Sequence, residues 1–282
     1  MHVRATTKVY GIFGHPVSHS LSPIMHNAAF RKLNLDCVYV AFDIHPTNLD
    51  SATQAIKSLG ILGVNVTIPH KERIISFLDE TSPEGTLTGA VNTVKNEDGK
   101  LTGYNTDVEG FLMAIKEDLG VIPRGLRILL LGAGGAARAV LTGLCMNEAS
   151  EIYLVNRTID KARALASEFK KSYKDISIEP YSLEDTDSVE RSLRTADLLI
   201  NASSSGMKGV APIKLQLELL PKDSMIYDLV YKPRETDLLK GAKELGLKAA
   251  GGLSMLIYQG AKSFEIWTGE KAPVDVMRKA IV

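Results

Sequence analysis

Short runs of apolar and β-branched residues alternate along this chain with longer segments in which apolar residues recur about every three or four positions. Runs of the first kind predict buried strands at residues 9–14, 38–44 and 61–68. Segments of the second kind predict helices between them, at residues 22–34 and 48–60. This alternation is typical of an α/β fold.

A second series of strands begins after a break at the Pro-Arg-Gly sequence of residues 123–125. Its members are RILLLG (127–132), EIYLVNR (151–157), ADLLINA (196–202) and MIYDLVY (225–231), each preceded by a segment of helical length. We therefore predict two α/β domains. The first spans residues 1–107 and is completed by C-terminal helices within 253–282. The second, residues 108–252, is a Rossmann-type domain with a doubly wound parallel sheet.

The charges of the chain balance, with 33 Lys and Arg residues against 33 Asp and Glu residues. A neutral chain gives no electrostatic reason to expect nucleic acid or an anionic membrane as a partner. The N-terminal residues lack the apolar core of a signal peptide, and no uncharged apolar run is long enough to span a bilayer. Cys37 and Cys145 match no metal-ligand spacing and suit a reducing compartment. We expect a cytoplasmic protein that binds small molecules, as a monomer or a homodimer.

A glycine-rich turn follows the first strand of the second domain. In LLLGAGGAARA, Gly132, Gly134 and Ala137 form a G-x-G-x-x-A pattern between a strand and a helix. The first glycine permits the turn, the second lets the backbone approach a pyrophosphate, and the small third residue allows close packing of helix and strand. The pattern favours dinucleotide binding, against the alternative of a tight turn without a ligand.

The end of the next strand bears on which dinucleotide is bound. NAD-binding domains usually place an acidic residue there, against the ribose hydroxyls. This chain has Asn156, Arg157 and Thr158, with Lys161 one helical turn later. Because Arg157 would attract a 2′-phosphate, we predict NADP as the cofactor. The alternative is that Arg157 is only a solvated surface cation.

Polar side chains also follow the predicted strands of the first domain. They are Asn65, Thr67 and Lys71 in NVTIPHK, Asn92 in GAVNT, and Asn105 and Asp107 in GYNTD. Ligands of open α/β sheets bind beyond the carboxyl ends of the strands, so these groups could converge on one site. One cation, one anion and several amides and hydroxyls suit a polyhydroxylated substrate that carries an acid group.

These motifs, together with SLSPIMHN, GAGGAAR, INASSSGM, DLVYKPRET and LSMLIYQGAKSFEIWTG, resemble the shikimate dehydrogenase family over residues 10–270. The resemblance implies an oxidoreductase of aromatic amino-acid biosynthesis that reversibly reduces 3-dehydroshikimate to shikimate with NADPH and without a metal. It implies that the substrate is bound by Ser20, Ser22, Asn65, Thr67, Asn92, Tyr231 and Gln259, with Lys71 and Asp107 as the catalytic pair.

The resemblance also implies a set of cofactor-binding residues. They are Gly132, Ala133, Gly134, Gly135 and Ala136 at the pyrophosphate, Asn156, Arg157, Thr158 and Lys161 at the 2′-phosphate, and Ser203, Leu229 and Gly252 elsewhere on the cofactor. Many relatives have arginine where this chain has Lys161, and lysine acts as a point charge without bidentate geometry.

Ketone reduction needs a hydride on carbon and a proton on oxygen. Lys71 is the only motif cation of the polar cluster, and its ammonium can donate the proton and stabilise a developing alkoxide. Asp107 would orient it. Which of the two groups formally transfers the proton stays open at this stage.

Three alternatives remain. His15, His19, His26 and His70 could suggest a metal site, although their spacings fit no standard zinc pattern. The chain could be a dual quinate/shikimate dehydrogenase, since the serine pair does not separate the two acids. It could also be a ligand-sensing module without catalysis, which should have lost Lys71 or Asp107; both are present.

Overall fold

The structure is a computed structural model that describes residues 3–282. The chain forms two compact units. Unit 1 contains the described residues up to Gly110 together with Ile257–Val282, and unit 2 contains Phe111–Leu256. The boundaries fall within the helices α4 (Asp107–Leu119) and α9 (Leu253–Thr268), so that each of these helices begins in one unit and ends in the other.

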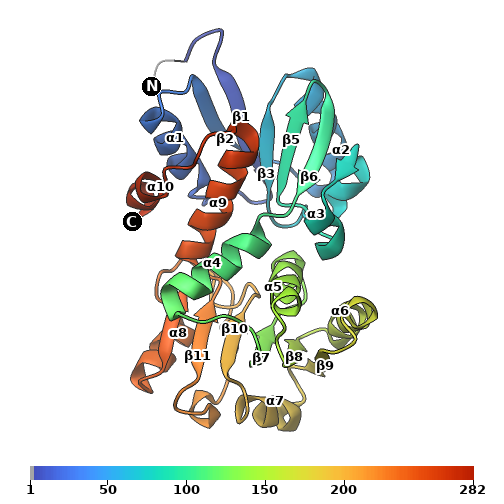
Figure 1. Ribbon diagram of the computed structural model, residues 1–282, viewed down its shortest axis with the longest axis vertical. Helices are drawn as coiled ribbons and strands as arrows, with labels where there is room; N and C mark the ends of the chain where they lie inside the picture. The colour runs from blue at the N-terminus through green and yellow to red at the C-terminus, as the bar shows by residue number, and fades with distance from the viewer. Residues whose placement is uncertain (1–2) are drawn as a thin grey trace. The chain divides into compact units, whose positions relative to one another are not determined.

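Unit 1 is built on a mixed six-stranded sheet in the order β2-β1-β3-β5-β6-β4 (Figure 1). Its strands are β1 (Lys8–Gly14), β2 (Cys37–Asp43), β3 (Gly63–Val66), β4 (Glu80–Thr81), β5 (Thr93–Glu97) and β6 (Lys100–Tyr104). The strands β2, β1 and β3 are parallel, and β5 and β6 form an antiparallel hairpin. Asp98 and Gly99 make its turn with φ of 52° and 89°, the left-handed conformations that two-residue hairpin loops need.

Helices α1 (Ser22–Lys32), α2 (Leu49–Ser58), α3 (Pro83–Thr88) and α10 (Val274–Ile281) complete unit 1, with the second part of α9. Apolar side chains of α2 and of the strands β3, β5 and β6 form one core cluster, which includes Ile56, Val64, Val94 and Leu101. Trp267 of α9 fixes that helix to the sheet by donating from its indole Nε1 to the carbonyl oxygen of Val94, at 2.9 Å.

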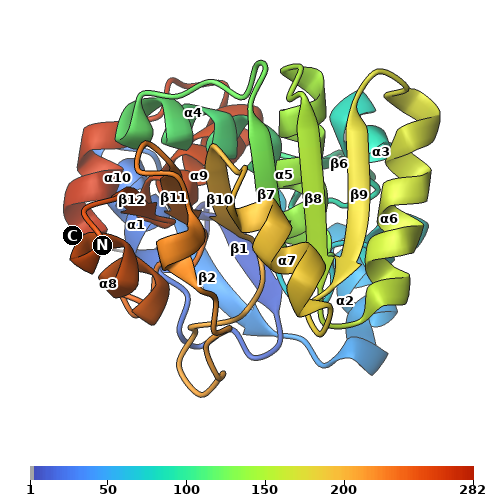
Figure 2. The same ribbon diagram turned by 90° about the horizontal axis from the view of Figure 1, so that it is seen from below.

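Unit 2 contains a fully parallel six-stranded sheet in the order β12-β11-β10-β7-β8-β9, which Figure 2 shows from below. The strands are β7 (Arg127–Leu131), β8 (Glu151–Asn156), β9 (Ser177–Ser182), β10 (Leu198–Asn201), β11 (Met225–Asp228) and β12 (Lys248–Gly251). The strand order reverses between β7 and β10, which is the switch point of a doubly wound sheet.

Both faces of the unit 2 sheet are covered. Leu129, Leu131 and Leu199 pack into one cluster with side chains of α7 (Thr186–Leu193) and α8 (Asp237–Glu244). The alternate residues Ile128 and Leu130 point to the opposite face and are also fully buried. The helices α5 (Gly135–Met146) and α6 (Ile159–Ser172) pack against β7 and against β8 and β9. Burial on both faces explains why these strands read as continuous apolar runs.

The fold class predicted from the sequence is confirmed, and two local predictions differ from the structure. The apolar pattern of residues 61–68 yields a strand only at Gly63–Val66, because Thr67 begins the polar turn that follows. The pairing of Ser22 with Pro23 predicts Ser22 as the N-cap of α1, but Ser22 is the first helical residue. Leu21 is the N-cap, without a side-chain hydrogen bond. Within residues 3–282, no helix is both long enough and apolar enough to cross a bilayer.

Candidate functional site

Lys71 and Asp107 form a close ion pair in unit 1. Lys71 lies in the turn after β3, and Asp107 is the first residue of α4. The Lys71 Nζ lies 2.6 Å from Asp107 Oδ2, and their side chains are only 16% and 6% exposed. The carbonyl oxygen of Lys71 accepts a hydrogen bond from the Val91 N–H at 2.8 Å, which fixes the backbone from which the lysine extends. The pair is therefore held at a defined place with little solvent around it.

Asn92 connects this ion pair to helix α9. Its Nδ2 donates to Asp107 Oδ1 at 2.8 Å and lies 3.3 Å from Gln259 Oε1. Its Oδ1 accepts from the Thr106 backbone N–H at 2.8 Å. Helix α9 can approach because Gly110 has no side chain: a Cβ there would lie 2.8 Å from the backbone nitrogen of Gln259. Asn92 thus sets the positions of both the catalytic candidate Asp107 and the substrate-binding candidate Gln259.

Asn65 is buried and fully used by neighbouring protein groups. Its Oδ1 accepts a hydrogen bond from the Tyr39 hydroxyl at 2.7 Å. Its Nδ2 lies within hydrogen-bonding distance of Asn92 O (3.1 Å), Thr93 Oγ1 (3.1 Å) and Ser263 Oγ (3.0 Å). Two protons shared among three acceptors leave this amide little capacity for a ligand.

The two serines expected at the substrate carboxylate lie at the start of helix α1. Ser22 is its first residue, and Ser20 lies in the loop before it. Ser20 is half-buried and Ser22 is buried, and the Ser22 N–H donates to Ser20 Oγ at 3.3 Å. Burial raises the pKa of Tyr39 well above its usual value, and a hydrogen bond with the Ser22 side chain opposes that rise. Thr67 is half-buried at the end of β3. Ser22, Tyr39, Asn65, Asn92 and Asp107 therefore belong to one connected set of polar contacts.

Sequence reasoning missed four members of this network. They are Tyr39, Thr93, Thr106 and Ser263, all buried. Ser263 lies one helical turn after Gln259 and donates to its carbonyl oxygen at 2.9 Å. A signal was available for three of them: Thr93 lies inside the GAVNT motif, Thr106 lies inside the GYNTD motif, and Ser263 lies on the same face of its helix as Gln259.

In unit 2, the glycine-rich turn leaves open the space that a phosphate would need. Gly132 has φ of 111°, and a Cβ there would lie 3.0 Å from the backbone of Ala202. Gly134 is the N-cap of α5 without a side-chain hydrogen bond, and nothing lies within 4 Å of a Cβ added to it. The first N–H groups of a helix have no partner within the helix, so this end of α5 presents uncapped donors. These features fit a bound pyrophosphate.

The candidates for the 2′-phosphate lie between β8 and α6. The Asn156 side chain donates from Nδ2 to the carbonyl oxygen of Thr158 at 2.8 Å, which shapes the turn. Arg157, Thr158 and Lys161 are exposed. Within the described part of the chain, neither Arg157 nor Lys161 forms an ion pair, so both cations are available to an anion.

Three more cofactor candidates lie on the loops that follow β10, β11 and β12. Ser203 and Leu229 are half-buried, and Gly252 is buried. A Cβ on Gly252 would collide with the carbonyl oxygen of Leu229, so only glycine fits there. Tyr231 follows Leu229 and belongs to unit 2, apart from the other candidates for substrate binding. Burial raises the pKa of Tyr231.

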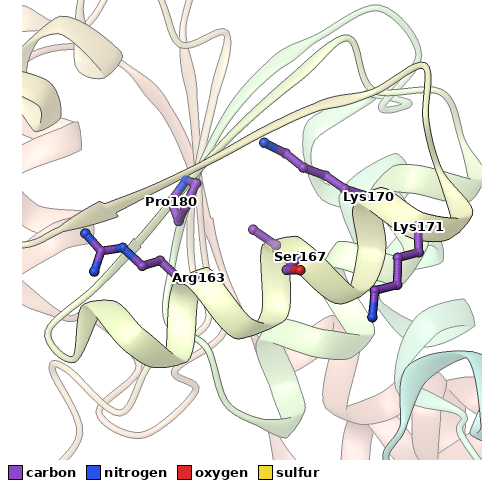
Figure 3. Close-up of a pocket in the computed structure, with 6 residues that line it drawn as sticks. Arg163, Ser167, Lys170, Lys171 and Pro180 are labelled. Carbon is purple, nitrogen blue, oxygen red and sulfur yellow. The ribbon is translucent and has the colours of Figure 1, made fainter.

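Unit 2 also has a hollow that none of these candidate residues lines. It measures about 370 Å³ and lies along α6 and β9, lined by Arg163, Ala166, Ser167, Lys170, Lys171 and Pro180 (Figure 3). Figure 3 shows Lys170 and Lys171 extending in different directions from the helix. Lys170 is paired with Glu179 at 3.2 Å. Among residues 3–282, no group of three or more His, Cys, Asp or Glu side chains is arranged to hold a metal ion.

Comparison with known proteins places the whole chain in one family. Three family models match it: "Shikimate dehydrogenase substrate binding domain" at residues 12–94, "Shikimate / quinate 5-dehydrogenase" at 119–237 and "Shikimate 5'-dehydrogenase C-terminal domain" at 252–282.

Similar proteins include the NADP(+) shikimate dehydrogenase of Methanopyrus kandleri, 47% identical over 99% of this chain and 97% of that protein. That of Methanocaldococcus jannaschii is 48% identical over 99% and 98%. A crystal structure of shikimate dehydrogenase in complex with NADP+ matches with a TM-score of 0.90 and 46% identity, over 99% of this chain and 96% of that one. The chain therefore belongs to the shikimate dehydrogenase family.

Proposed function

We propose that this chain is an NADP-dependent shikimate dehydrogenase that reversibly reduces 3-dehydroshikimate to shikimate in aromatic amino-acid biosynthesis. The observation that carries the proposal is the Lys71–Asp107 pair, buried among amide and hydroxyl groups in a chain of this family. Unit 1 is assigned to substrate binding and proton transfer, and unit 2 to cofactor binding.

Lys71 has the chemistry that the carbonyl oxygen of the substrate requires. NADP, in its reduced form, supplies the hydride to the carbonyl carbon when it is bound. The Lys71 ammonium hydrogen-bonds the carbonyl oxygen, stabilises the negative charge that develops on it, and donates a proton to it. The neutral amine left behind takes a proton back from solvent. Asp107 keeps the ammonium in place through the 2.6 Å contact.

The remaining polar groups of unit 1 are assigned to substrate recognition. Ser20 and Ser22 hydrogen-bond the carboxylate, while Thr67 and Gln259 bind ring hydroxyls. Asn92 holds Asp107 and Gln259 in place, because its Nδ2 already lies within hydrogen-bonding distance of Thr106 Oγ1, Asp107 Oδ1 and Gln259 Oε1. Tyr231 of unit 2 contributes a further hydroxyl. Asn65 acts mainly through Asn92, since its own amide is already used by Tyr39, Thr93 and Ser263.

The cofactor assignment follows from the free donors and cations of unit 2. The backbone of residues 132–136 binds the pyrophosphate at the N-terminus of α5. Asn156, Arg157, Thr158 and Lys161 bind the 2′-phosphate, with Arg157 supplying the charge-assisted hydrogen bonds. Ser203, Leu229 and Gly252 contact the rest of the cofactor through their loops.

The proposal is tested by mixing the purified protein with shikimate or quinate, and with NADP+ or NAD+, while following the absorbance of the reduced nicotinamide. We expect a kcat/KM with shikimate and NADP+ that exceeds each other combination by about tenfold or more. Comparable efficiency with quinate would instead indicate a dual-specificity enzyme. Ligand binding without any absorbance change would indicate a sensing module and would contradict the proposal.

A further inference from the structure

A buried carboxylate lies under the cofactor loops of unit 2 without belonging to the candidate site described above. Asp228, the last residue of β11, is 0% exposed. Its Oδ1 accepts from Asn201 Nδ2 at 2.9 Å and from the Val230 N–H at 3.0 Å, and its Oδ2 accepts from Thr236 Oγ1 at 2.6 Å. All three donors are neutral. Burial raises the pKa of Asp228, although these three hydrogen bonds oppose the rise.

Asn201 connects the Asp228 carboxylate to the neighbouring strand β10 and the loop that follows it. It ends β10 and is directly paired with Asp228 in the parallel sheet. Its Nδ2 also donates to the carbonyl oxygen of Ser205 at 3.0 Å. Its Oδ1 accepts from Ser203 Oγ at 2.6 Å and from the Ser203 N–H at 3.1 Å. The side chain that binds Asp228 therefore also fixes the loop that follows β10.

The loops tied to Asp228 are the ones that carry cofactor candidates. The loop after β10 carries Ser203 and passes against Gly132, where a Cβ would lie 3.1 Å from the Ser203 nitrogen. The loop after β11 begins at Leu229, whose carbonyl oxygen fills the space beside Gly252. Thr236 closes this second loop, since its Oγ1 caps α8 by accepting from the Leu239 N–H at 3.3 Å.

A carboxylate used only for stability would normally be paired with a cation, as Asp197 shows at the opposite end of β10. Asp197 accepts from the Arg127 guanidinium at 2.9 Å and from its backbone N–H at 2.8 Å. Asp228, in contrast, is desolvated and surrounded by neutral donors, all on segments that lead into the loops. Burying a carboxylate without a cation costs stability, and a role in holding the loop conformation would explain why Asp228 is buried in this way.

We propose that Asp228 is a positioning residue for cofactor binding. Through Asn201, Val230 and Thr236 it holds the loops after β10 and β11 in the conformation that presents Ser203, Leu229 and Tyr231. The inference rests on the proposed function for its choice of cofactor. It predicts that the contribution of Asp228 appears mainly in the affinity for NADP(H), and to a smaller extent in the affinity for shikimate through Tyr231.

The test is the substitution Asp228→Asn in the full-length protein. The amide oxygen can still accept from Asn201 and from the Val230 N–H, but the amide NH2 then faces the Thr236 hydroxyl, which can no longer donate there, and the negative charge is lost. We expect the KM for NADP+ and the Kd for NADPH, measured by fluorescence titration, to rise about tenfold or more, since a hydrogen bond to a charged group is lost. The KM for shikimate should rise much less, by about threefold at most, because Tyr231 is the only group assigned to shikimate that lies on these loops.

Asp197→Asn is the matched control, since it makes the same change at the other end of the same sheet. It should lower the melting temperature and leave the Kd for NADPH within about twofold. If Asp228→Asn behaves in the same way, Asp228 is only a stabilising residue and the proposal is overturned.

A second pair of variants keeps the test decisive if Asp228→Asn does not fold. Thr236→Val removes one donor to Asp228 and should raise the Kd for NADPH about threefold, while Thr236→Ser keeps the hydroxyl and should restore the wild-type value. Equal values of Kd for the two variants would overturn the proposal. The Kd for NADPH is measured without turnover. A protein that binds NADPH but does not oxidise shikimate would therefore refute the proposed function. The role of Asp228 in cofactor binding would still be tested by the Kd values of the variants.

Discussion

The two clusters of charge in this chain are built in opposite ways. In unit 1, the Lys71 ammonium already has its anion, Asp107, at 2.6 Å, and the pair is almost enclosed by hydrogen-bonded polar side chains. In unit 2, Arg157 and Lys161 are exposed and without an ion-pair partner among residues 3–282. The first cluster is complete before a ligand arrives, whereas the second needs an anion to complete it.

The difference matches the two tasks that we propose. A group that transfers a proton must hold one geometry through the reaction, and preorganised partners provide this. A group that selects between two cofactors needs unpaired charge that one of them satisfies. Substitutions in unit 1 should therefore change turnover, and substitutions at the second cluster should change the choice of cofactor.

The largest effect among the variants that probe this comparison is expected for Asp107→Asn. The amide keeps the size of the side chain and loses the charge that holds the Lys71 ammonium. We expect kcat for shikimate oxidation to fall about a hundredfold, with a much smaller change in the KM for NADP+.

The control for Asp107→Asn is Asp79→Asn, which breaks a second Lys–Asp pair of unit 1, that of Lys57 with Asp79 at 2.8 Å. This pair is 31% and 41% exposed, so its loss should leave kcat within about twofold. Similar kcat values for the two variants would contradict the prediction that the enclosed Lys71–Asp107 pair, unlike a partly exposed pair, is needed for turnover.

A smaller effect is expected for Arg157→Ala at the second cluster. Loss of a charge-assisted hydrogen bond to the 2′-phosphate should raise the KM for NADP+ about tenfold to a hundredfold and leave the KM for NAD+ nearly unchanged. Arg163→Ala, in the following helix α6, is the control, because Arg163 is already paired with Asp160 at 3.5 Å. An equal rise in KM for NADP+ and NAD+ would show that Arg157 does not bind the 2′-phosphate.

The smallest effect concerns stability and involves His26, a polar side chain in the core of unit 1. His26 is fully buried, stacked on Tyr39 at 4.4 Å, and neither ring nitrogen has a hydrogen-bond partner within the described chain. Burial lowers its pKa from 6.5 to about 3. Below pH 6.5, His26 is protonated in the unfolded chain but stays neutral in the folded chain. The free energy of unfolding therefore falls as the pH drops, by up to about 1.4 kcal/mol per pH unit.

The substitution His26→Phe should remove this dependence. Relative to wild type, the variant should gain about 2 kcal/mol in its free energy of unfolding between pH 7 and about pH 4.5, measured by urea denaturation. If His26→Phe and wild type lose stability in parallel, His26 is not the group that titrates.

In the unit 2 sheet, the sequence pattern predicts the four central strands, which are buried on both faces, and misses the two edge strands. The runs RILLLG and MIYDLVY predict β7 and β11, because a central parallel strand is apolar at every position. The edge strands β9 (Ser177–Ser182) and β12 (Lys248–Gly251) have mixed composition, and β9 contains Pro180. Edge position, which decides that such a segment can pair, is a tertiary property that a local pattern does not carry.

The candidate site shows the same limit. Lys71 and Asp107 lie close together, as the sequence predicts for two motifs that follow the carboxyl ends of strands in one sheet. The contacts of Asn65 with Tyr39 and Ser263 join segments 26 and 198 residues apart in the chain. Nothing in the local sequence of Asn65 predicts that its amide is used by protein groups, so its role as a positioning residue emerges only from the folded structure.

The most direct test of the central claim, that Lys71 supplies the proton, is a single-turnover measurement on Lys71→Ala. Excess variant saturated with NADPH is mixed with 3-dehydroshikimate, and the loss of nicotinamide absorbance is followed, while fluorescence titration verifies that NADPH is bound. We predict a rate about a thousandfold below wild type with NADPH affinity unchanged. A rate within about tenfold of wild type would contradict the assignment of the proton donor.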